Sequence, residues 1–295
     1  MTYRSHKLGL GTVQWGMDYG VSNTEGQVSL EEISRILTFA QQKLISILDT
    51  AALYGDAEER LGHHPLDRFK VITKTPHISE LLEVDEKSEA VLHSFSRSLR
   101  RLKQQSIYGL LVHRADALLE DGGDVLISAL QALKAEGQVR KIGVSIYNSE
   151  QLARLLDLFL PDIVQLPINV LDQRLVQDGS IAKLKKDGVE IHARSALLQG
   201  LLVMPIRDLP AYFAPWRDHL KSWHDHCADQ SVSPLQAALT YVCDVQAIDC
   251  CLIGVQSLTQ LQECLAGLDS GPRFDASDLA ADDPALTNPS NWILS

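Results

Sequence analysis

Four side chains capable of acid–base chemistry come soon after apolar segments in the first half of the sequence. Asp49 and Tyr54 follow one such segment, Lys74 follows the next, and His113 follows the one after that. In a barrel of parallel strands, the strand ends gather functional groups on one rim. A carboxylate, a phenol, an ammonium and an imidazole group on one rim can protonate a carbonyl oxygen while another group delivers a hydride. The four residues therefore predict an enzyme.

This chemistry requires the four residues to be neighbours. Taken singly, each has a structural explanation as a helix cap, a rim aromatic residue, a solvated strand end or a core histidine. Adjacent strands are only about 4.8 Å apart, however, so side chains at the ends of consecutive strands meet. A tyrosine hydroxyl is a weak acid at neutral pH unless a nearby cation stabilises its phenolate, and Lys74 can be that cation. Asp49 would keep Lys74 charged, and His113 would donate a hydrogen bond that positions the carbonyl.

Predicted strands and helices, which must position these residues, alternate along the whole chain. Eight apolar segments are predicted strands: 8–12, 45–48, 69–73, 107–112, 139–144, 163–166, 189–193 and 250–254. Helical periodicity appears between them, at about 29–40, 86–101, 124–136, 149–159, 181–187, 234–245 and 257–268. Strict alternation implies right-handed crossovers and a parallel sheet. We expect an α/β fold, a (β/α)8 TIM barrel with extended loops at its C-terminal rim.

An open, doubly wound dinucleotide fold is the chief alternative, but no Gly-x-Gly-x-x-Gly follows the first strand. Residues at the helix ends support the barrel pattern. Ser29 and Glu32 form the spacing of a capping box. Gly137, Gly188 and Gly267 are expected to end three helices.

Size and charge restrict the class of protein. The 295 residues, 45% hydrophobic and 22% charged, suit one barrel domain over 1–295. A net charge of -11 without a basic run argues against nucleic acid or an anionic membrane as a partner and favours a small molecule. The N-terminus is polar, and no apolar stretch approaches the roughly 20 residues of a membrane span. A cytoplasmic protein is expected.

The five cysteines fall in the last quarter of the chain and include no Cys-x-x-Cys pair: Cys227, Cys243, Cys250, Cys251 and Cys264. They are expected to be reduced, buried thiols without a metal or disulfide role.

Two segments depart from the alternation. The segment 195–233 is too long and too rich in aromatic residues for a plain loop. It forms either a lid over a ligand or a packed insertion with its own helix. The tail, about 270–295, has no periodicity, but its aromatic residues suggest that it docks somewhere on the protein.

The motifs together resemble the aldo-keto reductases. Asp49-Thr-Ala-x-x-Tyr54-Gly, Lys74 after an apolar strand and Leu-Val-His113 occur in that family's order, and the resemblance runs from Leu8 to about Gly267. It implies NAD(P)H-dependent reduction of an aldehyde or ketone, or the reverse reaction. Tyr54 would be the general acid, Lys74 and Asp49 would tune it, and His113 would orient the carbonyl.

The resemblance also implies contacts with the cofactor. Ser145 and Gln165 match residues that hold the nicotinamide carboxamide, although Ile146 stands where the family usually has Asn. The segment along the pyrophosphate would include Ser195, Leu197, Gln199, Gly200 and Leu201. The last strand and helix would contribute Gly254, Gln256, Ser257, Gln260 and Glu263. On physical grounds, Ser257 and Gln260 form a capping box at a helix start, where backbone N–H groups bind phosphate.

The resemblance implies NADPH, but the basic residues that commonly pair with its 2'-phosphate are replaced by Gln256 and Gln260. Use of NADH, or of both cofactors, therefore stays open. We expect Trp15, Tyr19 and Arg114 to line the substrate pocket. The alternative for Trp15 and Tyr19 is that they only fill the mouth of the barrel. A sugar-like carbonyl and a broad range of aldehydes are both compatible.

Two other functions remain as alternatives. One is a nicotinamide-binding regulatory subunit with little or no turnover. The other is a metal-dependent barrel hydrolase or isomerase, although the rim offers few further metal ligands beyond His113 and Asp49. A monomer or small homo-oligomer is expected.

Overall fold

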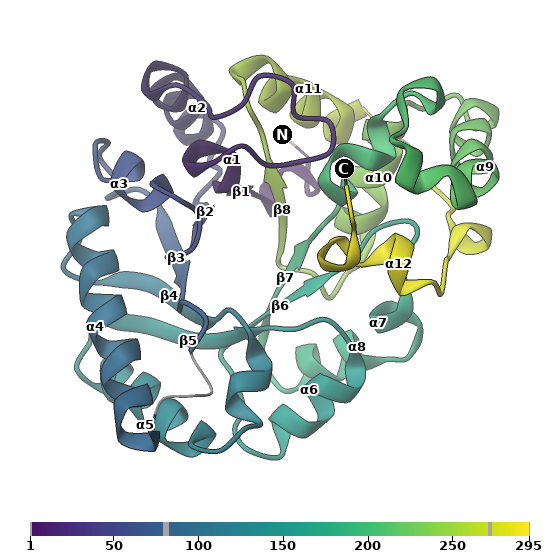
Figure 1. Cartoon of the computed structure of the whole chain (residues 1–295). Helices are drawn as coiled ribbons and strands as arrows, with labels where there is room; N and C mark the ends of the chain where they lie inside the picture. The colour runs from purple at the N-terminus through teal and green to yellow at the C-terminus, as the bar shows by residue number, and fades with distance from the viewer. Residues whose placement is uncertain (1, 79–82, 271–272, 295) are drawn as a thin grey trace.

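The computed structural model describes residues 2–78, 83–270 and 273–294. In these residues eight parallel strands form a closed barrel, each paired with its neighbours in chain order (Figure 1). The strands are β1 (Leu8–Gly11), β2 (Ile47–Asp49), β3 (Lys70–Lys74), β4 (Ile107–Val112), β5 (Val139–Ser145), β6 (Ile163–Pro167), β7 (Glu190–Arg194) and β8 (Cys250–Gly254). This confirms the predicted (β/α)8 fold, and each predicted strand is found close to its expected range.

Helices surround the strands, as Figure 1 shows. They are α1 (Val13–Gly16), α2 (Leu30–Gln42), α3 (Ala57–Leu61), α4 (Val84–Leu102), α5 (Gly123–Ala135), α6 (Ser149–Leu156), α7 (Arg174–Gln177), α8 (Ser180–Lys186), α9 (Arg217–Asp229), α10 (Pro234–Asp244), α11 (Leu258–Ser270) and α12 (Pro284–Thr287). Short 3-10 helices are η1 (Ser5–Lys7), η2 (Ala115–Leu118), η3 (Leu198–Val203), η4 (Ile206–Asp208), η5 (Ala211–Trp216), η6 (Ser277–Leu279) and η7 (Pro289–Asn291). The short helices α1, α3 and α7 were not predicted, because a single turn gives too little periodicity to read from sequence.

The predicted helix ends are confirmed in part. Ser29 Oγ accepts a hydrogen bond from the backbone N–H of Glu32, as an N-cap should. Gly137 and Gly188 lie just past α5 and α8 with φ of +75° and +80°, values that glycine adopts without strain. The expectation for Gly267 is wrong, since α11 continues through it to Ser270.

Side chains along each strand alternate between the barrel interior and the surrounding helices. Six apolar side chains form an interior cluster: Ile47, Ile72, Leu111, Ile163, Cys250 and Leu252. Two positions beyond four of them, on the strand or just past its end, come Asp49, Lys74, His113 and Gln165. The same alternation that buries the apolar cluster therefore turns these polar residues inward, nearer the C-terminal rim.

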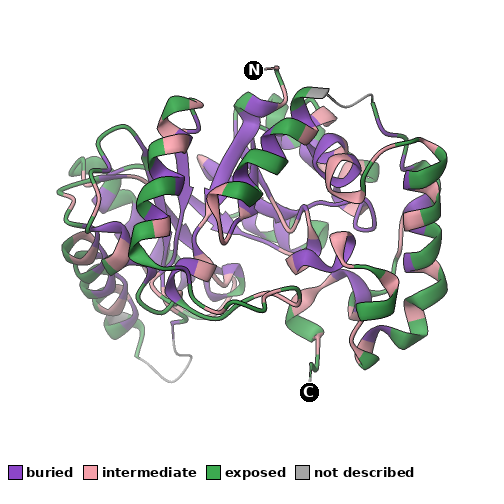
Figure 2. Cartoon of the chain, turned by 90° about the horizontal axis from the view of Figure 1, so that it is seen from above, coloured by how far each residue is buried: buried purple, intermediate pink, exposed green. Residues whose placement is uncertain are grey.

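The outward-facing strand residues form the main core against the helices, as Leu48 and Val71 do. Figure 2 shows this arrangement as buried strands with helices whose outer faces are exposed. The apolar stripe of α2 follows the predicted spacing, because Ile33, Ile36 and Leu37 are all buried there. This packing fixes the barrel, and thereby the positions of the strand ends.

The segment 195–233 forms a packed insertion with its own helix, α9. Phe213 and Trp223 are fully buried in a second core that includes Phe274 and Leu286 of the tail. Trp216 Nε1 donates a hydrogen bond to Asp283 Oδ2 at 3.0 Å. In Figure 1 the yellow tail lies below α9 and runs through α12 toward the C marker, near the label of α10. Docking of the tail is thus confirmed for residues 273–294, while residues 271, 272 and 295 lie outside the described part.

All five cysteines are buried and free, as expected. Among the described residues, none of the helices is both long and apolar enough to cross a membrane. The described part of the chain also holds no group of three or more His, Cys, Asp and Glu side chains arranged to bind a metal ion.

Candidate active site

Asp49, Tyr54, Lys74 and His113 meet at the rim of the barrel. Lys74 Nζ donates hydrogen bonds to Asp49 Oδ1 at 2.5 Å and to the carbonyl oxygen of Thr50 at 2.9 Å. The same nitrogen lies 3.4 Å from Tyr54 Oη. The rings of Tyr54 and His113 pack edge to face, with 5.8 Å between their centroids. The structure thus brings together the four residues that the sequence suggested.

Lys74 carries its charge inside the protein because Asp49 balances it. Only 1% of the Lys74 side chain and 6% of the Asp49 side chain are exposed. Burial alone would lower the pKa of Lys74, but the charge of Asp49, together with hydrogen bonds to Asp49 and Tyr54, raises it above its ordinary value. The ammonium group therefore stays protonated at neutral pH, within reach of the phenol oxygen of Tyr54.

His113 is a neutral imidazole at neutral pH. Burial lowers the pKa of His113 to about 3, and the positive charges of Lys74 and Arg194 add to the effect. Its Nδ1 is buried and has no hydrogen-bond partner among the described residues. Because a neutral imidazole carries one N–H, His113 can donate a hydrogen bond to a ligand oxygen without being a charged acid.

Gln165 fixes the second oxygen of the Asp49 carboxylate. Its Nε2 donates a hydrogen bond to Asp49 Oδ2 at 2.8 Å, and the residue is 2% exposed. Lys74 on β3 and Gln165 on β6 therefore hold the same carboxylate from two sides of the barrel. Ser145, the last residue of β5, pairs with Gln165 in the strand register and also lines the cavity described next.

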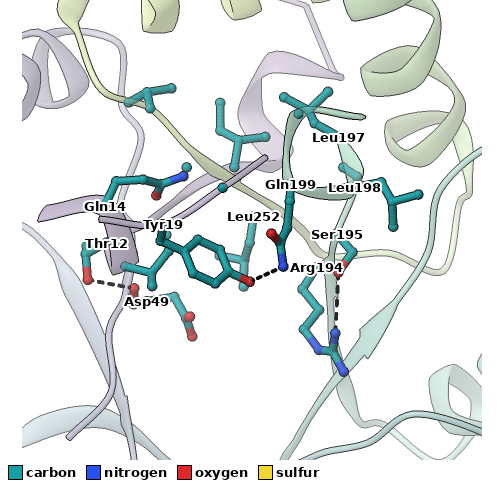
Figure 3. A pocket seen from close by; sticks show the side chains of 18 of the residues that line it. Thr12, Gln14, Tyr19, Asp49, Arg194, Ser195, Leu197, Leu198, Gln199 and Leu252 are labelled. Atoms are coloured by element: carbon teal, nitrogen blue, oxygen red, sulfur yellow. Dashed lines mark hydrogen bonds between the residues drawn. The ribbon is translucent and has the colours of Figure 1, made fainter. Parts of the chain in front are cut away.

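A cavity of about 540 Å³ opens above these residues (Figure 3). It runs from Asp49, Tyr54 and His113 to the start of α11, at Gln260. Further candidates from the sequence also line it: Tyr19, Ser145, Gln165, Ser195, Leu197, Gln199, Gly200, Gly254, Gln256 and Glu263. Its volume lies within the range of about 300 to 1,000 Å³ typical of small-molecule sites.

The loop between α1 and α2 joins the two far walls of this cavity. Gln199 Nε2 donates a hydrogen bond to Tyr19 Oη at 2.9 Å, and Val21 N donates to the Gln199 carbonyl at 3.1 Å. Figure 3 shows the Tyr19–Gln199 bond across the cavity. On the other wall, Gln256 Nε2 donates to Asn23 Oδ1 at 2.6 Å. The loop thus connects the segment after β7 to the segment after β8.

The cavity could hold a nicotinamide dinucleotide. It joins the catalytic side chains at one end to the segment after β8 and the start of α11 at the other. Gln14 Oε1, in the cavity wall, is a buried acceptor without a partner among the described residues, so it is available to a ligand donor. The absence of a side chain at Gly254 leaves room for Gln14, since a Cβ there would lie 2.4 Å from Gln14 Oε1.

The start of α11 differs in two respects from the expected capping box. Ser257 Oγ accepts from the Gln260 N–H at 3.2 Å, as predicted, but Gln260 Oε1 accepts from the N–H of Gln256 and not from that of Ser257. The N–H of Leu258 donates to Glu32 Oε1 of α2 at 2.6 Å. A carboxylate therefore already occupies part of this helix start.

Several expected site residues do not line the cavity. Lys74 lies behind Tyr54 and Asp49, Leu201 is buried in the second core, and Ser257 caps α11. Trp15 is fully buried in the main core, where its Nε1 donates to the Val255 carbonyl at 3.1 Å. Arg114 forms an ion pair with Glu120. Of the three residues expected in the substrate pocket, Tyr19 lines this cavity, and Trp15 and Arg114 do not.

Sequence reasoning missed Arg194 and Tyr147, which both line the cavity. Arg194 ends β7, two residues after His192 and four after Glu190. Alternation places these three side chains on one face of the strand. The spacing Glu-x-His-x-Arg at a strand end was therefore the available signal.

Comparisons with known proteins point to one family. The model of the aldo/keto reductase family matches residues 7–283. The oxidoreductase sirO of Leptosphaeria maculans is 26% identical over 84% of this chain and 83% of its own length. The L-galactose dehydrogenase of Arabidopsis thaliana is 28% identical over 76% of this chain and 74% of its own. The solved glycerol dehydrogenase of Gluconobacter oxydans has the same fold, with a TM-score of 0.68, 20% identity and coverage of 96% and 92% of the two chains.

Proposed function

The chain belongs to the aldo/keto reductase family, and on that premise we propose that it is a nicotinamide-dependent oxidoreductase that interconverts a carbonyl group and an alcohol. One observation carries the proposal. The buried ammonium of Lys74, paired with Asp49, lies 3.4 Å from the hydroxyl of Tyr54 at the edge of the cavity. A proton donor with an adjacent fixed cation is suited to a reaction in which negative charge develops on oxygen.

In the direction of reduction, Tyr54 Oη donates a proton to the carbonyl oxygen of the substrate. Lys74 stabilises the phenolate that remains, because its ammonium is protonated and cannot move away from Asp49. His113, neutral and in contact with the Tyr54 ring, donates a hydrogen bond that orients the same oxygen. In the direction of oxidation, the phenolate accepts the proton of the alcohol.

When bound, the reduced nicotinamide supplies the hydride. Ser145 and Gln165 would hold its carboxamide near Tyr54, and the segment 195–200 would lie along the pyrophosphate, as the resemblance implies. The hydrogen bonds of Tyr19 with Gln199 and of Asn23 with Gln256 would keep the α1–α2 loop over the cofactor. That loop would also exclude water from the reacting atoms.

We infer that NADH is accepted as well as NADPH. The cavity end at α11 is lined by Gln256, Gln260 and Glu263, and no Lys or Arg lines this end among the described residues. Glu32 adds a carboxylate at the helix start. A 2'-phosphate there would meet negative charge and no guanidinium or ammonium group.

The substrate is proposed to be a hydroxylated or otherwise polar carbonyl compound. Two of the similar proteins are named as dehydrogenases of L-galactose and of glycerol, both polyhydroxylated molecules. Polar groups in the cavity, among them Tyr19, Gln199 and Asn23, suit such ligands.

Fluorescence titration with NADH and NADPH, followed by assay of a carbonyl panel through loss of the reduced cofactor's near-ultraviolet absorbance, tests this function. We expect binding of both cofactors and reduction of at least one class of carbonyl. Tight binding without turnover over a broad panel, in both directions, would instead favour the nicotinamide-binding regulatory subunit. Failure to bind either cofactor would contradict both functions.

A further inference from the structure

Arg194 is the one Lys or Arg side chain among the described residues that line the cavity. It ends β7, where the alternation of Glu190 and His192 directs its side chain to the barrel interior. The nearest catalytic groups come from the other side of the rim, on β2 and β4. Arg194 is close enough to His113 for its charge to help lower the pKa of that imidazole.

The Arg194 guanidinium is held in place by neutral groups. Its Nη2 donates to the carbonyl oxygen of Ile146 at 3.1 Å, and its Nη1 lies 3.4 Å from Ser195 Oγ, the contact drawn in Figure 3. Its carbon centre is 4.4 Å from the centroid of the Tyr147 ring. A guanidinium group has five N–H donors, so with two in use three remain for a ligand.

No carboxylate in the described part of the chain neutralises this charge. Among the described residues, Asp and Glu oxygens lie within 4 Å of many Arg and Lys side chains, but none is that close to Arg194. Asp49, the carboxylate at this end of the cavity, is already bound to Lys74 and Gln165. In a chain with a net charge of -11, an unneutralised guanidinium facing a cavity is a candidate binding group for an anion.

We propose that Arg194 binds a carboxylate on the substrate, so that the enzyme acts on carbonyl compounds that also carry a carboxylate group. This inference rests on the proposed function. A guanidinium fork matches the two oxygens of a carboxylate, and the aromatic ring of Tyr147 behind it keeps the fork oriented. The phosphates of the cofactor are the other anion available. Their expected contacts are the segments 195–200 and 254–260, whereas Arg194 lies beside the catalytic side chains.

The test compares substrates of equal size that differ only in charge: meta- and para-formylbenzoate against the corresponding formylbenzamides. We expect the wild-type enzyme to reduce at least one formylbenzoate with a kcat/KM roughly 10- to 100-fold above that of its amide, which corresponds to about 1.4 to 2.8 kcal/mol. In Arg194→Gln this ratio should fall close to one, mainly through a higher KM for the acid. Arg194→Lys should retain part of the preference for the acid, because the lysine ammonium is a point charge and cannot bind both carboxylate oxygens as a guanidinium does.

Arg207→Gln is the matched control, since Arg207 lies on the surface with 85% of its side chain exposed. It should keep the wild-type ratio. An equal kcat/KM for acids and amides in the wild-type enzyme would overturn the inference. So would an Arg194→Gln enzyme that loses affinity for NADH while keeping the ratio, because Arg194 would then serve the cofactor's phosphates.

A binding measurement separates failure of this inference from failure of the proposed function. Benzoate and benzamide lack the aldehyde group of the test substrates, so the enzyme does not reduce them to an alcohol. Each can be titrated against the complex of the enzyme with reduced cofactor, and quenching of the cofactor's fluorescence reports binding. Benzoate should bind roughly ten-fold more tightly than benzamide to the wild type and no more tightly to Arg194→Gln. Equal binding of the two by the wild type contradicts the carboxylate site. Absence of any carbonyl reduction, with this binding preference intact, contradicts only the proposed catalysis.

Discussion

Gln165 and Asp49, which come from strands on different sides of the barrel, are joined by a hydrogen bond of 2.8 Å between Nε2 and Oδ2. The other carboxylate oxygen binds Lys74. Gln165 is therefore a positioning residue for the Lys74 ammonium, in addition to the cofactor contact that the family resemblance implies.

Replacing Gln165 by Leu should lower kcat by roughly 10- to 100-fold, because a hydrogen bond to a buried charge contributes about 1.5 to 3 kcal/mol. The affinity for cofactor, measured by fluorescence titration, distinguishes the two roles. A large rise in Kd with an unchanged kcat would assign Gln165 to the cofactor alone. Gln138→Leu is the control, since Gln138 also donates to a carboxylate, that of Glu136, but lies just before β5 and outside the cavity lining.

Tyr54→Phe removes the hydroxyl beside Lys74 and keeps the ring that packs against His113. We expect turnover to fall by about 10² to 10⁴, the usual contribution of general acid catalysis. The Kd for the cofactor should change little, because in the proposed mechanism the hydroxyl contacts the substrate. Wild-type turnover in this variant would rule out Tyr54 as the proton donor.

Lys74→Met replaces the buried ammonium by an apolar side chain of similar length. The Asp49 carboxylate then lacks its cation, and the Tyr54 phenolate loses its stabilisation. Turnover should fall about as far as in Tyr54→Phe. The pH dependence of kcat should change, because without the ammonium the phenol is a weaker proton donor for reduction and the phenolate needed for oxidation forms only at a higher pH. Superimposable pH profiles for the wild type and Lys74→Met would contradict this coupling.

Gly16→Ala should displace Tyr54, because a Cβ at Gly16 would lie 1.8 Å from the Tyr54 carbonyl oxygen. Such overpacking typically costs about 1 to 3 kcal/mol. Urea unfolding should show that loss, and kcat should fall with it. Gly267→Ala is the matched control: its Cβ would meet its nearest neighbour at an ordinary 3.5 Å, inside α11. That variant should be more stable by about 0.5 to 1 kcal/mol, with unchanged activity.

The neutral state of His113 predicts sensitivity to acid. Burial lowers the pKa of His113 in the folded protein to about 3, below the ordinary value of about 6.5 that applies when the chain unfolds. As the pH falls through 6.5, the unfolded state therefore binds a proton that the folded state does not, and stability decreases toward about pH 3, by at most about 1.4 kcal/mol per pH unit.

Urea unfolding near pH 7 and near pH 5 checks the sign and size of this effect. The free energy of unfolding should decrease less in His113→Asn than in the wild type. His93→Asn, a change on the exposed face of α4, should follow the wild type. An equal decrease in all three proteins would show that His113 does not contribute.

The sequence predicted the barrel well because its signals are local. Short apolar segments and amphipathic helices repeat with the correct periods, so each strand and most helices were found near their observed ranges. Single-turn helices such as α3 were missed, and α11 was ended too early at Gly267, because packing against neighbouring elements outweighs the weak helix propensity of one glycine. Trp15 was misplaced for a related reason, since nothing in its local sequence distinguishes a wall of the cavity from the core.

By itself the sequence determined that acidic, phenolic, ammonium and imidazole groups follow consecutive strands, and hence that they share a rim. Only the tertiary structure decided which groups meet there: the Gln165 amide with Asp49, the Glu32 carboxylate with the start of α11, and the Arg194 guanidinium with the Ile146 carbonyl. Local sequence patterns are enough to predict the order of the strands and the alternation of their side chains between the two faces. Contacts across the barrel depend on how its closure brings distant residues together, which no local pattern encodes.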